Sequence, residues 1–506
     1  MNTDTDTPTL EAARWTRTHI TPGSLFLLSY CTAFSLSKYL GLLPGYAIDD
    51  YHIISRQHEG EQIGFFLSQG RYGSALVDFL LQGSALNMMS FSVISLIASM
   101  VFSALFFTTV IAPRNDSPKI ALASIAAVLG AHSYYSEYVT FRQSALPMSL
   151  MFTFIWLAAL AYRKCVFGER QNRWKQAIIA VVAGSAAMGF NQLAVCYCAT
   201  AVLYLHLRAQ TNDPASRSIG RNVSMLLRGT ALSVTTGATL IAANMLISAS
   251  LRGLLEIPVD ARATIIATSQ LDERAHQIAA LIPKLLYSGE VIASPIAKLT
   301  LLGGILVLLV PLTSREINRS CLAAYFLMLG TAITLVPVAL SSTWWPVPRS
   351  LICFPFVLAG GASLLATAEK HKRLYVSTAL FVTSALLFSA HSNTALLNQQ
   401  RLNRWDIAQA QAIALRAAAQ FPDSSMRIAI TDAHWYHPLA PGIAQGDMNT
   451  SAMAIGWAVD SLFDESTGRD LNVRSAPELT HMCKNRQPFP AQDSMQENKG
   501  EVVVCM

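Results

Sequence analysis

The segment Leu86–Ala112, with the sequence LNMMSFSVISLIASMVFSALFFTTVIA, holds 27 residues and no charged side chain. An apolar stretch of about 20 residues is long enough to cross the hydrocarbon core of a bilayer as a helix. The whole chain of 506 residues shares this character, because 52% of its residues are hydrophobic and only 13% are charged. A typical soluble domain has about 25% charged residues. The sequence therefore predicts an all-α, multi-span membrane bundle.

Eleven such stretches follow one another along the chain. They lie near residues 24–43, 87–111, 120–135, 145–162, 177–190, 193–207, 229–251, 296–313, 320–340, 350–366 and 374–391. The third, fifth and sixth are short and could instead form partly re-entrant hairpins. The fifth and sixth could also be one helix interrupted at Asn191-Gln192. The connections on either side, 163–175 and 208–228, carry five and four Lys/Arg residues and should share one side of the membrane, which favours two spans.

Lys and Arg residues predict the orientation of these spans. Eighteen of them lie in the N-terminal segment and in alternate connections, whereas the short connections between carry only Arg142 and Arg349. Because basic loops stay cytoplasmic, we expect a bacterial inner-membrane protein with a cytoplasmic N-terminus and a periplasmic C-terminus. Residues 44–86 and 252–295 would then be periplasmic loops. The net charge of +6 follows from this bias and needs no nucleic-acid partner.

The sequence predicts two regions, a transmembrane domain over residues 1–391 and a small periplasmic α/β domain over residues 392–506. The second region begins with a polar stretch, HSNTALLNQQRLNRWD, that suggests an amphipathic helix leaving the membrane. Two strands are expected, within Met426–Tyr436 and at Glu501–Cys505. The loop 252–295 is expected to hold one or two amphipathic helices on the membrane surface, either contacting substrate or simply covering the surface.

Cys483 and Cys505 are the only cysteines of the C-terminal region. In the oxidising periplasm they are expected to form a disulfide rather than remain free thiols. Asp432, His434 and His437 could gather on one loop, but their irregular spacing favours a packing role over a metal site.

Two adjacent carboxylates, Asp49 and Asp50, follow the first predicted span at the outer membrane edge. Charged groups at membrane depth are costly and commonly mark functional sites. One Asp could cap a short surface helix, but a cap accounts for one acid and not for two. The like charge of a neighbour and partial burial raise the pKa of such a pair, and a carboxylate that titrates near neutrality can act as a general base. We therefore predict that this pair is catalytic, with the identity of the base left open.

Three arginines on the predicted outer side, Arg71, Arg142 and Arg349, could bind a phosphate group through their forked donors. Each could instead anchor lipid headgroups or pair with an acid such as Glu137. Neighbouring residues could stack on a sugar ring or hydrogen-bond to it, although Trp and Tyr are also common at any membrane edge. The predicted substrate-binding residues are Tyr51, Glu61, Gln69, Tyr135, Glu137, Trp344 and Trp345.

The order of Asp49-Asp50 after the first span and Gln69-Gly70-Arg71 about twenty residues later resembles the bacterial serotype-converting glucosyltransferases. These O-antigen-modifying enzymes are similar to the wider class of polytopic glycosyltransferases with the GT-C fold. The resemblance covers the membrane region, is strongest over Tyr46–Arg71, and does not extend to the C-terminal region.

The resemblance implies transfer of a hexose, commonly glucose, from an undecaprenyl-phosphate carrier to the O-antigen of lipopolysaccharide at the periplasmic face. It implies one inverting displacement, with Asp49 or Asp50 as the base. Arg71, Arg142 and Arg349 would stabilise the leaving phosphate. A companion flippase and an enzyme that makes the donor lipid would be partners, along with the donor, the acceptor and membrane lipids.

No Gly-rich phosphate loop occurs in the sequence, so a nucleotide sugar is not expected as the donor. Neither a cofactor nor a divalent metal is expected, because the leaving group is a lipid monophosphate. An O-antigen polymerase, a transporter or flippase of lipid-linked sugars, and an acetyltransferase remain alternatives. The polymerase would depend on large arginine-bearing outer loops, and the transporter on ionisable groups near the bilayer centre.

Overall fold

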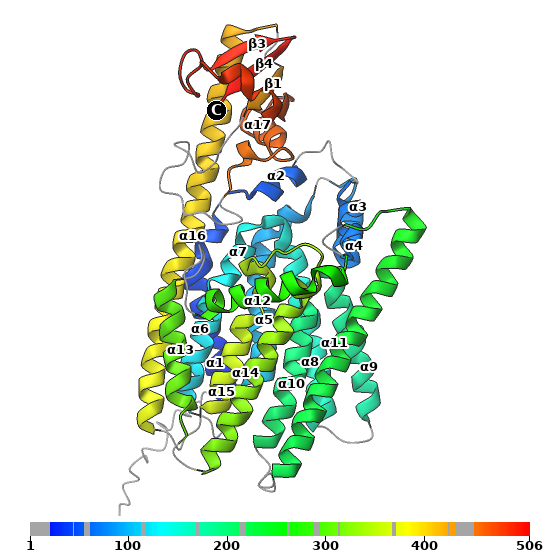
Figure 1. Cartoon of the computed structure of the whole chain (residues 1–506), viewed down its shortest axis with the longest axis vertical. Coiled ribbons are helices and arrows are strands. Elements are labelled where there is room, and N and C mark those ends of the chain that lie inside the picture. Colours follow the sequence, from blue (N-terminus) through cyan, green and yellow to red (C-terminus); the bar gives the residue numbers. More distant parts are fainter. Residues whose placement is uncertain are drawn as a thin grey trace, which may run out of the picture.

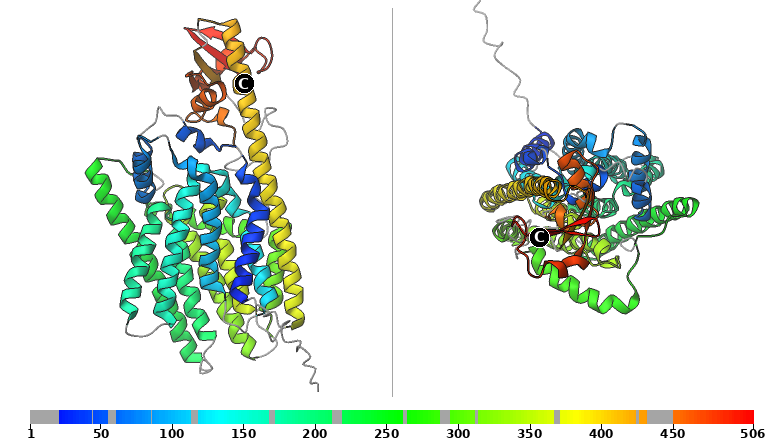
Figure 2. Two further views of the ribbon diagram at one scale, coloured as in Figure 1. Left: turned by 180° about the vertical axis from the view of Figure 1, so that it is seen from behind. Right: turned by 90° about the horizontal axis from the view of Figure 1, so that it is seen from above.

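The computed structural model describes residues 21–43, 45–54, 61–84, 86–112, 118–167, 172–211, 219–260, 264–286, 294–311, 314–366, 371–423, 426–431 and 450–506. This part of the chain is mostly helical, with one small sheet near the C-terminus (Figure 1). The long helices run side by side as a bundle, and the sheet stands beyond one end of it (Figure 2). The predicted fold class is thus confirmed at the level of a helical bundle with a small C-terminal α/β part.

The α-helices are α1 (Pro22–Lys38), α2 (Ile48–Ile54), α3 (Glu61–Ser68), α4 (Tyr72–Leu81), α5 (Ser92–Ile111), α6 (Lys119–Ala131), α7 (Tyr134–Thr140), α8 (Arg142–Phe167), α9 (Arg173–Phe190), α10 (Ala194–Thr211), α11 (Ile219–Leu255), α12 (Leu271–Leu286), α13 (Pro295–Leu309), α14 (Ser314–Leu340), α15 (Phe354–Leu365), α16 (His371–Gln420) and α17 (Val459–Thr467). Each of the eleven predicted spans falls on one of them.

Length and composition qualify seven of the described helical stretches as candidate membrane spans. They are Pro22–Leu42, Met88–Ile111, Arg142–Phe167, Val223–Leu255, Glu316–Leu340, Pro348–Leu365 and Lys372–Gln420. Three of the other predicted spans fall on the shorter apolar helices Lys119–Ala131, Ala194–Ala209 and Pro295–Leu309. The remaining one coincides with α9, which begins with Arg173 and also contains Lys175. The chain therefore has the character of a multi-pass membrane protein, while a total of eleven spans stays a prediction.

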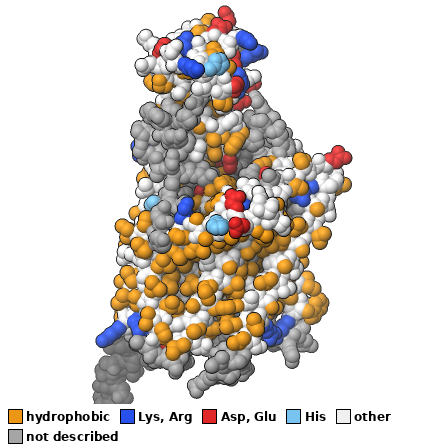
Figure 3. All heavy atoms as spheres, in the orientation of Figure 1, with side chains coloured by type: hydrophobic (Ala, Val, Ile, Leu, Met, Phe, Trp, Pro, Cys, Tyr) orange, Lys and Arg blue, Asp and Glu red, His pale blue; other side chains and the backbone are white. Residues whose placement is uncertain are grey.

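The outer surface of the bundle is apolar. Leu246, Met328 and Leu386, on α11, α14 and α16, are 70%, 68% and 66% exposed. Figure 3 shows hydrophobic side chains over this whole face of the bundle, with Lys and Arg side chains near its lower end. So wide an apolar surface exceeds what a soluble monomer exposes and suits contact with lipid.

The helix α5 shows how local sequence sets these elements. Asn87 and Ser90 form a capping box, in which each side chain accepts a hydrogen bond from the backbone N–H of the other. The 20 uncharged residues of α5 follow directly.

The helices α1 and α6 pack closely against each other, and a Cβ atom on Gly130 of α6 would lie 2.4 Å from the Tyr30 carbonyl oxygen of α1. Only glycine fits that crossing.

The helix α12 lies within the predicted loop 252–295 and crosses the bundle in its half nearer the C-terminal sheet (Figure 1). Its Arg274 is buried and donates to the carbonyl oxygens of Val338 (2.7 Å) and Ser342 (3.3 Å) at the end of α14. The same guanidinium lies over the Trp344 ring, 4.9 Å from its centroid. These contacts attach α12 to the bundle, and they give Trp344 a packing role.

The helix α16 is continuous over 50 residues. It begins in the bundle, leaves it, and ends beside the sheet (Figure 1). The boundary predicted at residue 392 therefore falls inside one helix. Because the helix does not break there, the bundle and the C-terminal region share a rigid element.

The C-terminal sheet has four strands in the order β2-β1-β4-β3. The predicted strands are confirmed as β1 (Arg427–Thr431) and β4 (Glu501–Cys505), which pair in parallel. β2 (Asn472–Ser475) pairs in parallel with the other edge of β1, and β3 (Met495–Asn498) forms an antiparallel hairpin with β4. The residues Asp432, His434 and His437 lie outside the described part of the chain.

Cys483 and Cys505 form the disulfide that the sequence predicts, with Cα atoms 5.5 Å apart and a sequence separation of 22. A bridge that closes a loop of this length contributes about 3 kcal/mol to stability. Replacing both cysteines with Ser should therefore lower the unfolding free energy of the C-terminal region by about that amount. Urea unfolding followed by limited proteolysis measures it, with the exposed free Cys321 changed to Ser as the control. Equal stability of the two variants would contradict this role.

Candidate functional site

A cavity opens at the end of the bundle that carries the C-terminal sheet. It has a volume of about 1310 Å³, counting the space at its open mouth. Its walls come from α2, the α3–α4 hairpin, α7, the start of α8, the α9–α10 turn, the end of α14 and the segment that leads into the 3-10 helix η8 (Pro348–Leu351). Its main polar residues are Asp49, Gln69, Arg71, Tyr138, Gln143, Asn191, Gln192 and Arg349.

The side chains of Asp49 and Asp50 on α2 point in different directions, because successive helical residues are rotated by about 100°. Asp49 lines the cavity. Asp50 is fully buried, and its carboxylate accepts three backbone hydrogen bonds. The donors are the N–H groups of Ala47 (2.9 Å) and Arg142 (3.2 Å) on Oδ2 and of Gln143 (3.0 Å) on Oδ1.

Two of these donors belong to the first turn of α8, where backbone N–H groups have no partner within the helix. Asp50 therefore caps α8 and ties α2 to it. Burial raises the pKa of Asp50 to about 7, and the three N–H donors oppose that shift. Asp50 is not among the described residues that line the cavity. The geometry therefore favours Asp49 as the acid that can meet a substrate, while a catalytic role for either acid stays a prediction.

Arg349 reaches the cavity from η8. Its guanidinium lies between two aromatic rings, 4.2 Å from the Trp345 centroid and 4.8 Å from the Phe141 centroid. Glu137 of α7 is fully buried and holds Arg349 twice, by a 3.5 Å ion pair to the guanidinium and by accepting a hydrogen bond from the Arg349 backbone N–H. Glu137 therefore positions Arg349, and it is not among the described residues that line the cavity, while its predicted contact with substrate stays a prediction.

Arg71 stands at the turn between α3 and α4 and also lines the cavity. The guanidinium groups of Arg71 and Arg349 both affect the pKa of Tyr138, which also lines the cavity. Burial raises the pKa of Tyr138, whereas the guanidinium groups of Arg71 and Arg349 lower it. The Tyr138 hydroxyl also accepts a hydrogen bond of 2.9 Å from the Asn191 side chain. Two cations therefore lie near Tyr138, and Asp49 lines the same cavity.

The turn that carries Arg71 depends on Gly70. Gly70 has φ +76°, and a Cβ atom there would lie 3.1–3.3 Å from polar atoms of Gln192, Asn244 and Ser248. The neighbouring Gln69 donates to Asp260 (3.3 Å), and its carbonyl oxygen accepts a hydrogen bond from Gln192. The backbone on both sides is thus fixed, so that a side chain at Gly70 has little room.

Replacing Gly70 with Ala should strain this turn by about 1–3 kcal/mol and displace Arg71. We expect any activity that depends on Arg71 to be lower by about tenfold or more, since small misplacements of binding groups have large effects on rate. The control is Gly83→Ala, because Gly83 has a similar φ of +74° but no atom within 4 Å of an added Cβ. Equal activity of the two variants would show that the packing around Gly70 does not hold Arg71 in place.

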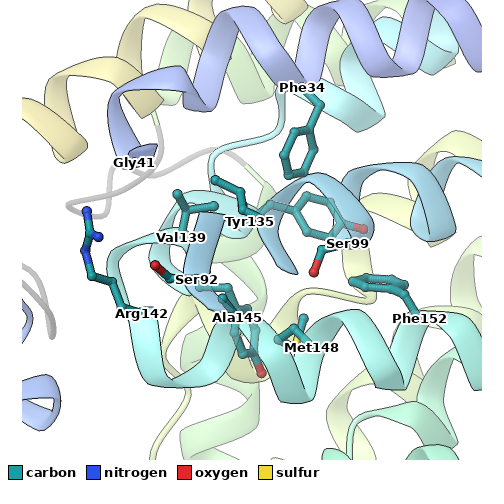
Figure 4. A pocket seen from close by; sticks show the side chains of 12 residues that line it. Phe34, Gly41, Ser92, Ser99, Tyr135, Val139, Arg142, Ala145, Met148 and Phe152 are labelled. Atoms are coloured by element: carbon teal, nitrogen blue, oxygen red, sulfur yellow. The ribbon is translucent and has the colours of Figure 1, made fainter. Parts of the chain in front are cut away.

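Arg142 is not among the described residues that line the main cavity, so the structure does not bring it together with Arg71 and Arg349, and its role as a phosphate ligand stays a prediction. Its guanidinium donates to the carbonyl oxygens of Gly45 (2.7 Å) and Leu43, and so holds the connection between α1 and α2. It edges a second, smaller and largely apolar slot of about 500 Å³. In Figure 4 the Arg142 guanidinium points toward the segment at Gly41, while Tyr135 and Ser99 lie deeper in the slot.

Three more predicted substrate contacts lie elsewhere among the described residues. Tyr51 turns into the core of the C-terminal region. Tyr135 is buried, with its hydroxyl 3.1 Å from that of Tyr197. Trp344 packs on Arg274 of α12. The side chain of Glu61 lies outside the described part of the chain, and Gln69 and Trp345 do line the cavity.

Four of the main polar residues of the cavity were not assigned to a site from the sequence: Tyr138, Gln143, Asn191 and Gln192. From the sequence, Asn191-Gln192 could either hydrogen-bond a substrate or close a hairpin, and the hairpin was favoured; in the structure the Leu193 N–H donates to Asn191 Oδ1 (3.0 Å) within that turn. The available signal was a pair of amides in a tight turn on the predicted outer side. Their distance in sequence from Gln69 and Tyr138 concealed the contacts that bring them together.

Among its described residues, the cavity thus combines one carboxylate with two guanidinium groups, amides and aromatic rings. A carboxylate can accept a proton from a hydroxyl group, and guanidinium groups can stabilise a developing phosphate charge. No group of three or more His, Cys, Asp or Glu side chains that could hold a metal occurs among the residues described by the structure.

Comparison with known proteins gives no match, either to a protein-family model, to a curated protein or to a solved structure.

Proposed function

We propose that this chain is a membrane glycosyltransferase. It would move a hexose, most simply glucose, from an undecaprenyl-phosphate donor to the O-antigen of lipopolysaccharide. The observation that carries this proposal is the placement of Asp49, Arg71 and Arg349 on one cavity at the end of an apolar bundle. The resemblance over Tyr46–Arg71 supplies the donor and acceptor, which the cavity chemistry suits.

In the proposed reaction, Asp49 takes the proton of an acceptor hydroxyl group. The acceptor oxygen attacks the anomeric carbon of the donor sugar, and the bond from that carbon to the phosphate oxygen breaks. Polyprenyl phosphate leaves with the electron pair, and the anomeric configuration inverts. Arg71 and Arg349 would stabilise the phosphate as its charge increases.

The distribution of basic side chains supports a periplasmic site. Three arginines donate to backbone carbonyl oxygens at the helix ends opposite the C-terminal sheet. Arg163 donates to Thr109, Arg208 to Val110–Ala112, and Arg373 to Val310. That end would be cytoplasmic because Lys and Arg concentrate on the cytoplasmic side. The cavity and the C-terminal region would then face the periplasm of a bacterial inner-membrane protein.

Mass spectrometry of the O-antigen repeat tests the proposal, with cells that carry the gene, cells that lack it, and cells that carry Asp49→Asn. A gain of one hexose per repeat that is lost in the variant is the expected result. An unchanged repeat mass with an altered chain length would replace the proposal with the polymerase. An added acetyl group would replace it with an acetyltransferase. Neither change, with lipid-linked sugars accumulating on one side of the membrane, would indicate a flippase.

A further inference from the structure

The helix α2 is shared between the bundle and the C-terminal region. Asp50 attaches it to α8, as described above. On its other side, Ile48 and Tyr51, at 8% and 1% exposure, belong to the same hydrophobic core as Ile413 of α16 and Phe463 of α17. Figure 1 shows α2 directly between the bundle and α17. The apolar face of α2 is therefore covered by the C-terminal region.

The helix α16 fixes the same segment by hydrogen bonds, just where it leaves the bundle. Gln399 donates to the carbonyl oxygen of Tyr46 (2.8 Å), and Gln400 donates to that of Leu40 (2.7 Å). One turn later, Asn403 donates to the hydroxyl oxygen of Tyr51. The three contacts hold the α1–α2 connection along one stretch of α16.

The C-terminal region is in turn hydrogen-bonded to α16 at Asp406. Both oxygens of this buried carboxylate accept hydrogen bonds, Oδ1 from the Ser451 hydroxyl (2.6 Å) and Oδ2 from the Ala452 N–H (2.9 Å). Ala452 begins the 3-10 helix η10 (Ala452–Ala454) and belongs to the core that contains Ile48 and Tyr51. The contacts that hold the C-terminal region and those that hold α2 therefore lie within about two turns of α16, Gln399–Asp406.

We propose that the C-terminal region positions Asp49, with Tyr51 and Asn403 as its positioning residues. A helix of seven residues is not stable alone, because nucleation is costly and few hydrogen bonds follow. It keeps its place through packing, and its packing partners are the core of the C-terminal region and the first turn of α8. The role of Asp49 as a base rests on the proposed function, whereas the coupling of α2 to the C-terminal region does not.

Hydrogen exchange in the full-length protein tests the coupling, followed over the peptide that spans α2. Asn403→Ala removes the amide that donates to Tyr51, and Tyr51→Ala removes the ring as well. In both variants, exchange of the α2 amides should be faster by about tenfold or more, with α10 and the part of α8 beyond its first turn unchanged. The matched control is Leu415→Ala, on α16 in the C-terminal region, where the side chain is 70% exposed.

Kinetics give a second readout. Asn403→Ala should lower kcat by about tenfold or more with little change in the donor KM, because the misplaced group is the base and not the phosphate ligands. Unchanged exchange in α2 for both variants would overturn the positioning role, whatever the reaction is. Faster exchange in α2 with no sugar transfer by the wild-type protein would keep the coupling and overturn the proposed function. If Tyr51→Ala loses protection throughout the protein, its fold as a whole is destabilised. The exchange of α2 in Asn403→Ala then decides between these results.

Discussion

Replacing Asp49 with Asn is expected to lower the rate of sugar transfer by about 10²- to 10⁴-fold, the usual contribution of a general base. Asn has nearly the same shape as Asp but cannot take a proton from the acceptor hydroxyl. Because Asp49 lines an open cavity and is not the carboxylate that caps α8, the protein should keep its amount in the membrane and its Tm. Transfer from a synthetic polyprenyl-phosphate sugar in detergent measures the rate, and a thermal shift assay measures the Tm.

Two other variants test whether the loss of activity is specific to Asp49. Asp50→Asn would place an amide N–H₂ against backbone N–H donors, so we expect a loss of about 1–3 kcal/mol in stability and a lower Tm. Asp272→Asn is the matched control, because this acid is highly exposed at the start of α12 and should change neither quantity. Full activity of Asp49→Asn would remove Asp49 from the reaction, and a slow Asp50→Asn with a normal Tm would transfer the role of base to Asp50.

Replacing Arg349 or Arg71 with Ala is expected to lower kcat by about 10²- to 10³-fold, as for the loss of one donor that stabilises transition-state charge. The phosphate gains charge as its bond to the sugar breaks, so the contribution should appear in kcat more than in the donor KM. Arg349→Lys should restore little of it, because Lys has no planar fork to lie between the rings of Trp345 and Phe141.

Kinetic constants from donor titrations measure these effects. Arg252→Ala is the control, since this arginine lies in the last turn of α11 and is not among the described residues that line the cavity. A higher donor KM with an unchanged kcat would mean that the arginines bind the lipid phosphate equally in the ground and transition states. That result would contradict their role in stabilising the leaving group.

Much of the architecture was predictable because it depends on local sequence. A run without charges, such as Leu86–Ala112, can avoid water and satisfy its backbone only as a helix, and the observed α5 lies within it. The strands β1 and β4 also follow short-range patterns. The disulfide needed only two cysteines in one small region. The continuity of α16 was missed, because polar composition after residue 391 marks an exit from lipid and not the end of a helix.

The candidate site was only partly predictable. Asp49, Arg71, Arg349, Gln69 and Trp345 do line one cavity. Sequence placed Asp50 and Arg142 with them because it records neighbours along the chain, and not the direction of each side chain or its partners. A rotation of about 100° per residue turns Asp50 toward α8 and away from the cavity.

The sequence by itself determined that this chain is a bundle of apolar helices with a small C-terminal α/β region and a disulfide. The tertiary structure alone decided which of the two acids lines the cavity (Asp49) and which arginines line it as well (Arg71 and Arg349). It also decided that α2 packs into the core of a region some 350 residues away, where Asn403 donates to Tyr51 across a separation of 352. The physical reason is that helix formation depends on hydrogen bonds and apolar runs within about 20 residues, whereas side-chain pairing depends on contacts between segments that only folding brings together.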